Sequence, residues 1–102
     1  MTYAIRFSEG VERELRALRA YDQTLVLDGI EEQLSHRPDA RTRRKKTLED
    51  FTAPEEWAAE PPIWQLHVGG FPVFYDVDRE KRLVWVRAIR RKPAHKTTGE
   101  IL

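Results

Sequence analysis

The sequence predicts a single α+β domain, in which an N-terminal strand and an antiparallel two-helix hairpin pack on a small antiparallel β-sheet, in the order β-α-α-β-β-β. Residues 64–90 predict the sheet, because apolar and polar side chains alternate there in three runs separated by turn residues. Residues 9–36 predict the hairpin, because apolar side chains recur at helical spacing among charged ones. The length of 102 residues fits one domain, so we expect residues 1–102 to fold as a unit.

The N-terminal part predicts a strand followed by two helices. Residues 3–7 alternate apolar and polar side chains, which is typical of a half-buried strand. Ser8 is a candidate N-cap for a helix over residues 9–20, and the apolar stripe of that helix consists of Val11, Leu15 and Leu18. A short break at residues 21–22 separates it from a second helix that extends to about residue 36.

The second helix carries an apolar stripe and a glycine. The stripe consists of Val26, Leu27, Ile30 and Leu34. Gly29 weakens the helix by up to about 1 kcal/mol relative to alanine, and it permits close approach to a neighbouring element. Pro38 ends the helix. The short connection predicts a helical hairpin, and the sheet is the surface available for it to cover.

Residues 37–62 are the least regular part of the chain. Residues 47–48 form a candidate short extended segment, and residues 55–59 a candidate helical turn. The remainder of residues 53–62 contains three prolines and predicts a loop. We expect Trp57 in this loop to be exposed or to contact a partner.

The first two strands of the sheet are joined by a tight turn. Alternation places one set of side chains on one face (Trp64, Leu66, Val68, Phe71, Val73, Tyr75 and Val77) and another on the opposite face (Gln65, His67, Pro72, Phe74 and Asp76). Gly69 and Gly70 predict a two-residue hairpin turn. Asp76 and Asp78 are interpreted as turn formers and not as a metal-binding pair.

The last strand leads into a cationic tail. In residues 83–90, alternation groups Leu83, Trp85, Arg87 and Ile89 against Val84, Val86, Ala88 and Arg90. Pro93 ends the strand. Residues 87–96 are rich in Arg and Lys, which indicates a phosphate-bearing partner, with a solvated terminus as the alternative interpretation.

The charge of the chain is unevenly distributed. The formal net charge is +1, but residues 41–46 form a second basic run, and an acidic stretch follows at residues 49–60. The absence of cysteine excludes disulfides and thiolate metal sites and is compatible with a reducing compartment. No apolar run approaches the ~18–20 residues of a membrane span, and residues 1–10 lack a signal-peptide pattern. We therefore expect a cytoplasmic protein without membrane contact.

Two sequence patterns carry a resemblance to a known family. They are W-x-L-x-V-G-G-F-x-V-F-Y-D-V-D, starting at Trp64, and V-x-V-R-A-I-R-R-K, starting at Val84. With the strand and helices before them, they resemble the RelE/ParE superfamily of type II toxin–antitoxin toxins over nearly the whole chain. The resemblance implies an antitoxin partner. It also implies one of two activities: RelE-like members cleave mRNA on the ribosome without metal, and ParE-like members bind DNA gyrase.

The resemblance implies a metal-independent endoribonuclease that inhibits translation and needs no cofactor, and this is the leading hypothesis. In RNA cleavage the 2′-hydroxyl attacks the adjacent phosphate, so the site needs proton-transfer groups and cations. The candidate catalytic residues are His67, Arg91, Lys92 and His95. The candidate RNA-phosphate contacts are Arg44, Lys45, Lys46, Arg87, Arg90 and Lys96.

The chain departs from the RelE pattern at positions that matter for cleavage. Gln65 and His67 stand where RelE-like toxins carry exposed basic residues, Pro72 stands where they carry an arginine, and no tyrosine follows Tyr75. The departure at Pro72 favours the alternative hypothesis of a ParE-like gyrase-binding toxin. A third hypothesis is a degenerate toxin that retains antitoxin binding and operator autoregulation. The alternative to a catalytic role for His67 is that it is an ordinary solvent-exposed side chain on the polar face of its strand.

Overall fold

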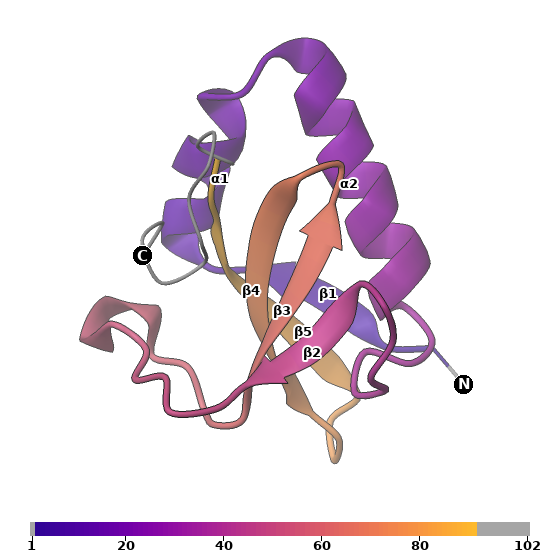
Figure 1. The fold of residues 1–102 in the computed structure, drawn as a ribbon, viewed down its shortest axis with the longest axis vertical. Coiled ribbons are helices and arrows are strands. Elements are labelled where there is room, and N and C mark those ends of the chain that lie inside the picture. The colour runs from indigo at the N-terminus through magenta and orange to yellow at the C-terminus, as the bar shows by residue number, and fades with distance from the viewer. Residues whose placement is uncertain (1, 92–102) are drawn as a thin grey trace.

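The computed structural model, which describes residues 2–91, is a five-stranded sheet with two helices packed on one face (Figure 1). The strand order is β1-β5-β4-β3-β2; β1 runs parallel to β5, and the other neighbours are antiparallel. The α+β class is confirmed. The elements are β1 Ala4–Phe7, α1 Glu9–Arg16, α2 Ala20–Leu34, β2 Lys45–Leu48, a 3₁₀ turn η1 Glu55–Trp57, β3 Ile63–Val68, β4 Phe71–Asp78 and β5 Leu83–Ile89.

The helical hairpin is present, but its break lies earlier than the sequence predicts. α1 ends at Arg16 and α2 begins at Ala20, so the predicted break at residues 21–22 is wrong. Asp22 instead occupies the first turn of α2, where a carboxylate is favoured by the helix dipole, and accepts a hydrogen bond from Arg19 Nε at 3.2 Å. Leu18 stays buried although it lies in the connection. In Figure 1 the helices meet at this connection and diverge along the sheet, α1 over β5 and α2 over β3.

The main core fills the space between the helices and the sheet. Its buried members are Val11, Leu18, Val26, Ile30 and Leu34 from the helical part and Trp64, Leu66, Val68, Val73, Tyr75, Val84, Val86 and Ile89 from the strands. The predicted stripe of α2 is wrong at Leu27, which is 40% exposed. Val26, Ile30 and Leu34 recur every four residues and already fill the contact with the sheet, so a side chain one position further around the helix points away from it.

Glycine permits the closest approach between α2 and the sheet. A Cβ added at Gly29 would clash with the side chain of Val68 in β3, so the predicted close packing is confirmed. The tight turn after Val68 is also confirmed, because Gly69 and Gly70 have φ angles of 53° and 86° and join β3 to β4. A side chain at Gly69 would meet Leu25, so the turn itself packs against α2.

A β-bulge changes which residues of β5 share a face. The register between β4 and β5 shifts at Phe74 and Tyr75, with Phe74 opposite Ala88 and Tyr75 opposite Val86. The extra residue, Arg87, leaves the ladder there and reverses the alternation that follows it. Ile89 therefore joins Val84 and Val86 in the main core, and its predicted grouping with Trp85 is wrong.

Candidate nucleic-acid interface

The face of the sheet opposite the helices, here called the distal face, carries most of the residues that the sequence marks as functional. Its rows follow from the strand register and include Lys46, Gln65, His67, Pro72, Phe74 and Asp76. It divides into two parts of different character. Toward η1 it is covered by a small aromatic cluster, and beside β2 it is polar.

The aromatic cluster is a second, smaller core. Trp57 from η1 lies over Phe74 and beside Phe51, with ring centroids 5.4 and 5.9 Å apart. Ile63 and Ala88 complete it. Trp57 is 5% exposed, so its predicted exposure is wrong. The reason is that residues 49–62 fold back over the sheet, which no local pattern in a proline-rich segment indicates.

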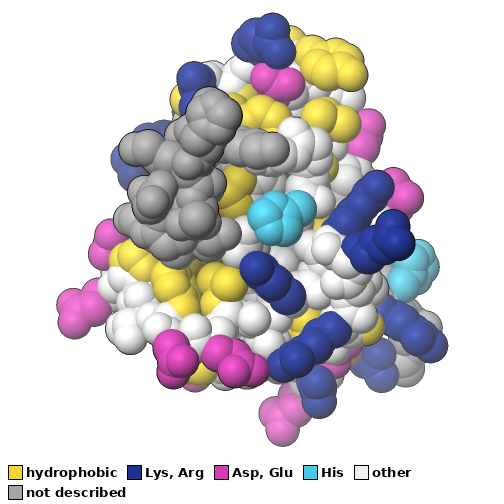
Figure 2. All heavy atoms as spheres, in the orientation of Figure 1, with side chains coloured by type: hydrophobic (Ala, Val, Ile, Leu, Met, Phe, Trp, Pro, Cys, Tyr) yellow, Lys and Arg dark blue, Asp and Glu magenta, His cyan; other side chains and the backbone are white. Residues whose placement is uncertain are grey.

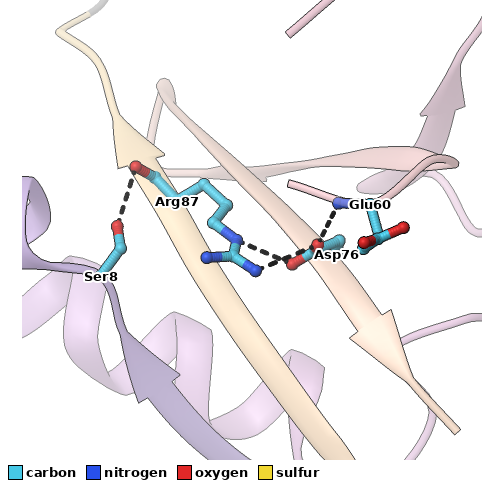
Figure 3. A network of polar contacts seen from close by, with 4 residues as sticks. All are labelled: Ser8, Glu60, Asp76 and Arg87. Carbon is cyan, nitrogen blue, oxygen red and sulfur yellow. Dashed lines mark hydrogen bonds and ion pairs between the residues drawn. The ribbon is translucent and has the colours of Figure 1, made fainter. Parts of the chain in front are cut away.

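A buried ion pair lies beside this cluster (Figure 3). Arg87 Nε and Nη2 donate to the two carboxylate oxygens of Asp76 at 3.0 and 3.2 Å, and the backbone N–H of Glu60 donates to the same carboxylate at 2.6 Å. The guanidinium also lies 5.0 Å from the ring centroid of Trp85. The interpretation of Asp76 as a turn former is wrong; its place in the alternation of β4, in one row with Pro72 and Phe74, was the available signal. Asp78 does form the turn, accepting from Lys81 N at 3.0 Å.

Arg87 was predicted to contact phosphate. The bidentate pair with Asp76 uses two of its donor groups, and the Arg87 side chain is only 13% exposed. A phosphate contact would therefore compete with the carboxylate for the same guanidinium. The backbone carbonyl of Arg87 accepts a hydrogen bond from Ser8 Oγ at 3.2 Å, which connects β5 to the start of α1 (Figure 3).

The polar part of the distal face brings together three residues of the predicted site, Arg44, Lys46 and His67, with Gln65. Lys46 in β2 lies opposite Gln65 in β3, and the carbonyl of Arg44 accepts a hydrogen bond from the backbone N–H of His67 at 2.9 Å. Arg44, Lys46 and His67 are exposed. Gln65 is fully buried, although alternation placed it on an exposed strand face, and its amide nitrogen lies 3.0 Å from His67 Nε2.

Lys45 lies on the other side of the sheet from Lys46. Its side chain is buried, and Nζ donates to the carbonyls of Gln33 at 3.0 Å and Arg37 at 2.6 Å, at the C-terminal end of α2. Burial lowers the pKa of Lys45, and the nearby Asp39 carboxylate partly offsets this effect. The ammonium thus binds helix-end carbonyls, and Lys45 is left out of the set that we propose for RNA contact.

The remaining predicted cations of the described chain lie against α1. Arg90 pairs with Glu14, whose other carboxylate oxygen accepts from Ile89 N at 2.9 Å, and its guanidinium lies 5.7 Å from the ring centroid of Trp57. Arg91 donates to the carbonyl of Ala17, at the end of α1. Lys92, His95 and Lys96 lie outside the described residues.

Pro72 lies directly opposite His67 in the β3–β4 ladder. It is buried, and its carbonyl accepts a hydrogen bond from Arg90 N at 2.9 Å, which keeps β5 attached at this point. The position where the family resemblance implies an arginine is therefore adjacent to His67 across the strands, and here it supplies an apolar ring.

The charge of the surface follows this division. Figure 2 shows basic side chains gathered on the side where the chain enters β2, and acidic ones along the edge formed by residues 49–62. The exposed members are Arg41, Arg43, Arg44 and Lys46 in the first group and Glu49, Asp50, Glu55, Glu56 and Glu60 in the second. The polar part of the distal face thus borders a basic surface, which suits a polyanion.

Across residues 2–91, no three His, Asp or Glu side chains are grouped so that they would hold a metal ion. In the same part of the chain, no helix has the length and apolar character needed to cross a membrane.

Comparison with known proteins gives matches in structure. No protein-family model and no curated protein matches the chain. The RelBE2 toxin–antitoxin complex from Mycobacterium tuberculosis superposes with a TM-score of 0.69 and 21% identity, covering 87% of this chain and 96% of that one. The archaeal RelE–RelB complex from Pyrococcus horikoshii gives 0.68 and 18%, covering 95% and 100%.

This chain has the RelE fold. The isolated RelE toxin of E. coli also matches, with a TM-score of 0.61 and 18% identity over 96% of this chain and 90% of that one. The fold resemblance predicted from the strand motifs is confirmed. At these identities the comparison establishes the RelE fold.

Proposed function

We propose that this chain is the toxin of a type II toxin–antitoxin pair and binds a cognate antitoxin protein. Two structures that share its RelE fold are RelE–RelB complexes, and they match over 87% and 95% of the chain. This chain matches 96% and 100% of the length of those two chains. The test is co-purification of the tagged chain with the product of a short reading frame beside its gene. The absence of a stable complex with that product would contradict this proposal.

We further propose that the toxin acts as a ribosome-dependent endoribonuclease on mRNA. The observation that supports this most directly is the polar part of the distal face, where Arg44 and Lys46 lie beside the strand that carries His67. Lys46 is opposite Gln65 and therefore diagonal to His67, and diagonal neighbours lie ~7–8 Å apart, a distance that a long side chain spans. One RNA phosphate can therefore meet both a cation and an imidazole.

The chemistry assigns different tasks to these groups. As the 2′-hydroxyl attacks, the phosphoryl group gains negative charge, which Arg44 and Lys46 stabilise by charge-assisted hydrogen bonds. Arginine binds two phosphate oxygens at once, whereas lysine acts as a point charge. His67 supplies a hydrogen-bonding imidazole beside them.

Cleavage mapping on translated mRNA tests the nuclease proposal. Wild type is compared with Arg44→Ala, His67→Gln and Arg91→Ala, and with His36→Gln as a matched control, because His36 is exposed outside the sheet. We expect His67→Gln to reduce cleavage by ~10²-fold or more, and His36→Gln to leave it unchanged. No ribosome-dependent cleavage by the wild type would exclude this activity.

The second candidate function is a gyrase-binding toxin without nuclease activity. Pro72 favours it, because an apolar ring occupies the ladder position opposite His67, where a cation would stabilise the phosphate. Inhibition of gyrase supercoiling with accumulation of cleaved DNA, in the absence of mRNA cleavage, would support this candidate instead.

A further inference from the structure

Gln65 is the only fully buried amide side chain that the described chain places on the distal face. It lies in β3, opposite Lys46 of the edge strand β2 on one side and Phe74 of β4 on the other. Its side chain is 0% exposed, and its amide nitrogen lies 3.0 Å from Nε2 of the exposed His67. A buried amide in contact with an exposed imidazole differs in kind from the aromatic packing around Phe74 and the Asp76–Arg87 ion pair on the same face.

The direction of this hydrogen bond determines the tautomer of His67. In the amide orientation that the structure gives Gln65, the nitrogen faces His67 Nε2, and because an amide nitrogen only donates, Nε2 accepts its N–H. A neutral imidazole has one N–H and one acceptor nitrogen, and the hydrogen bond made by one nitrogen selects the state of the other. With Nε2 as the acceptor, the ring proton of His67 is on Nδ1.

We propose that Gln65 is a positioning residue that holds His67 in the Nδ1–H tautomer and makes it a hydrogen-bond donor to RNA phosphate. The part of this inference that concerns RNA rests on the proposed function; the tautomer does not. Neutral histidine in water favours the Nε2–H form, so the contact with Gln65 selects the less common state.

The Nδ1–H tautomer determines which role His67 can have in cleavage. The Nε2 lone pair of a neutral His67 is engaged by the amide, and Nδ1 carries a proton, so His67 is not the base for the 2′-hydroxyl. It donates toward the charge that develops on the phosphoryl oxygens. Burial of Gln65 favours this role, because a side chain locked by packing holds its partner in one geometry.

Nitrogen NMR spectroscopy of the imidazole rings tests the tautomer directly. The full chain is labelled with ¹⁵N-histidine and measured at pH 8.5, where imidazoles are neutral, and His67 is assigned from the His67→Gln variant. We expect a protonated Nδ1 and an unprotonated Nε2 for His67. Exposed His36, which the structure places outside the sheet, serves as the internal reference and should favour Nε2–H. A wild-type His67 that is mainly Nε2–H overturns the proposal, whatever the variants do.

Gln65→Leu tests whether the amide is the cause. Leucine keeps most of the buried volume and removes the donor, so His67 should shift toward the Nε2–H form of His36. Persistence of the Nδ1–H form in a folded Gln65→Leu chain would overturn the proposal. If this variant does not fold, Gln65→Met provides the same comparison, and the wild-type spectrum alone still decides the tautomer.

Kinetics on the ribosome test the link to function. We expect Gln65→Leu to lower kcat for cleavage about tenfold, less than the ~10²–10⁴-fold of an acid–base group, and to change KM less than twofold. A purely structural role would instead lower stability and leave kcat of the folded fraction unchanged. A wild type with the expected tautomer and no cleavage would reject the proposed nuclease function while leaving the role of Gln65 toward His67 intact.

Discussion

The two faces of this sheet are built from the same strands and serve different purposes. The helix-covered face is continuous and apolar, with Leu66, Val73 and Tyr75 fully buried beneath α1 and α2. The distal face is divided between an aromatic cluster, a buried ion pair and a polar part. Lys45 and Lys46 illustrate this difference, because adjacent residues of one strand face opposite sides of the sheet: Lys45 is buried on the helix-covered face and Lys46 is exposed on the distal face. A side chain on the first face is explained by packing, and one on the second must be explained by its individual contacts.

The largest expected effect is the loss of the buried ion pair on the distal face. Asp76→Asn should lower the free energy of unfolding by about 3–5 kcal/mol, because it leaves the guanidinium of Arg87 without its counter-charge in a site that is 5–13% exposed. Urea denaturation measures it. Arg79→Gln is the matched control, since Arg79 is 72% exposed in its pair with Asp39 and should cost less than about 1 kcal/mol. Equal effects of the two variants would mean that the Asp76 pair is open to solvent.

The two lysines test the assignment of faces. Lys45→Met should destabilise the fold by about 1–3 kcal/mol, because the carbonyls of Gln33 and Arg37 lose their donor at the end of α2. Lys46→Met removes an exposed side chain and should leave the urea midpoint unchanged. Similar midpoints for both variants would contradict the structural role of Lys45.

Tyr75 tests the helix-covered face through pH. Its hydroxyl donates to the carbonyl of Pro38 at 2.6 Å, so Tyr75→Phe should cost about 1–2 kcal/mol. Burial, with a smaller contribution from Asp39, raises the pKa of Tyr75 above its ordinary value of about 10. The unfolded chain therefore loses this proton first, and the stability from Tyr75 is complete below pH ~10 and declines above it.

Denaturation at pH 8 and pH 11 measures this contribution. The loss of stability between the two values should be larger for wild type than for Tyr75→Phe, since the other titrating groups are common to both. An equal loss would mean that the phenol of Tyr75 titrates alike in the folded and unfolded chains.

The smallest effect on stability, and the most informative for function, is expected at Lys46. Lys46→Gln should leave the unfolding midpoint unchanged and weaken RNA binding at low salt. Removal of one phosphate contact should reduce the slope of log K against log salt concentration by about 0.7 for single-stranded RNA. Lys81→Gln, at an exposed position in the turn between β4 and β5, is the matched control and should keep the slope. An unchanged slope in Lys46→Gln would remove this residue from the interface.

Several features were predictable from the sequence because they depend on local chemistry. Strand alternation gave the correct face for Trp64, Leu66 and Val68, and the glycine pair predicted the hairpin turn. The close approach at Gly29 followed from the absence of a side chain within an otherwise regular helix. The polar row that contains His67 was also predictable, since a two-residue period assigns it a face.

The predictions that proved wrong depend on contacts between segments that are distant in the sequence. Trp57, Gln65 and Asp76 were expected near solvent or in a turn, and all three are buried. Trp57 and Asp76 are covered or bonded by segments distant in sequence: Trp57 by Phe74, and Asp76 by Arg87 and the backbone of Glu60. The bulge at Arg87 reassigned Ile89 in the same way, since it exists only where β4 and β5 pair.

The sequence by itself determined which residues of each strand lie together, because alternation and turn geometry are properties of a few consecutive residues. Only the tertiary structure decided which segments cover each face of the sheet and which polar groups form hydrogen bonds or ion pairs with one another. Residues 49–62 had to fold back before one part of the distal face could be apolar and the other polar. The contact between Gln65 and His67 joins two residues that the sequence already placed in one row. Its meaning depends on the burial of Gln65, which lies between Lys46 of β2 and Phe74 of β4.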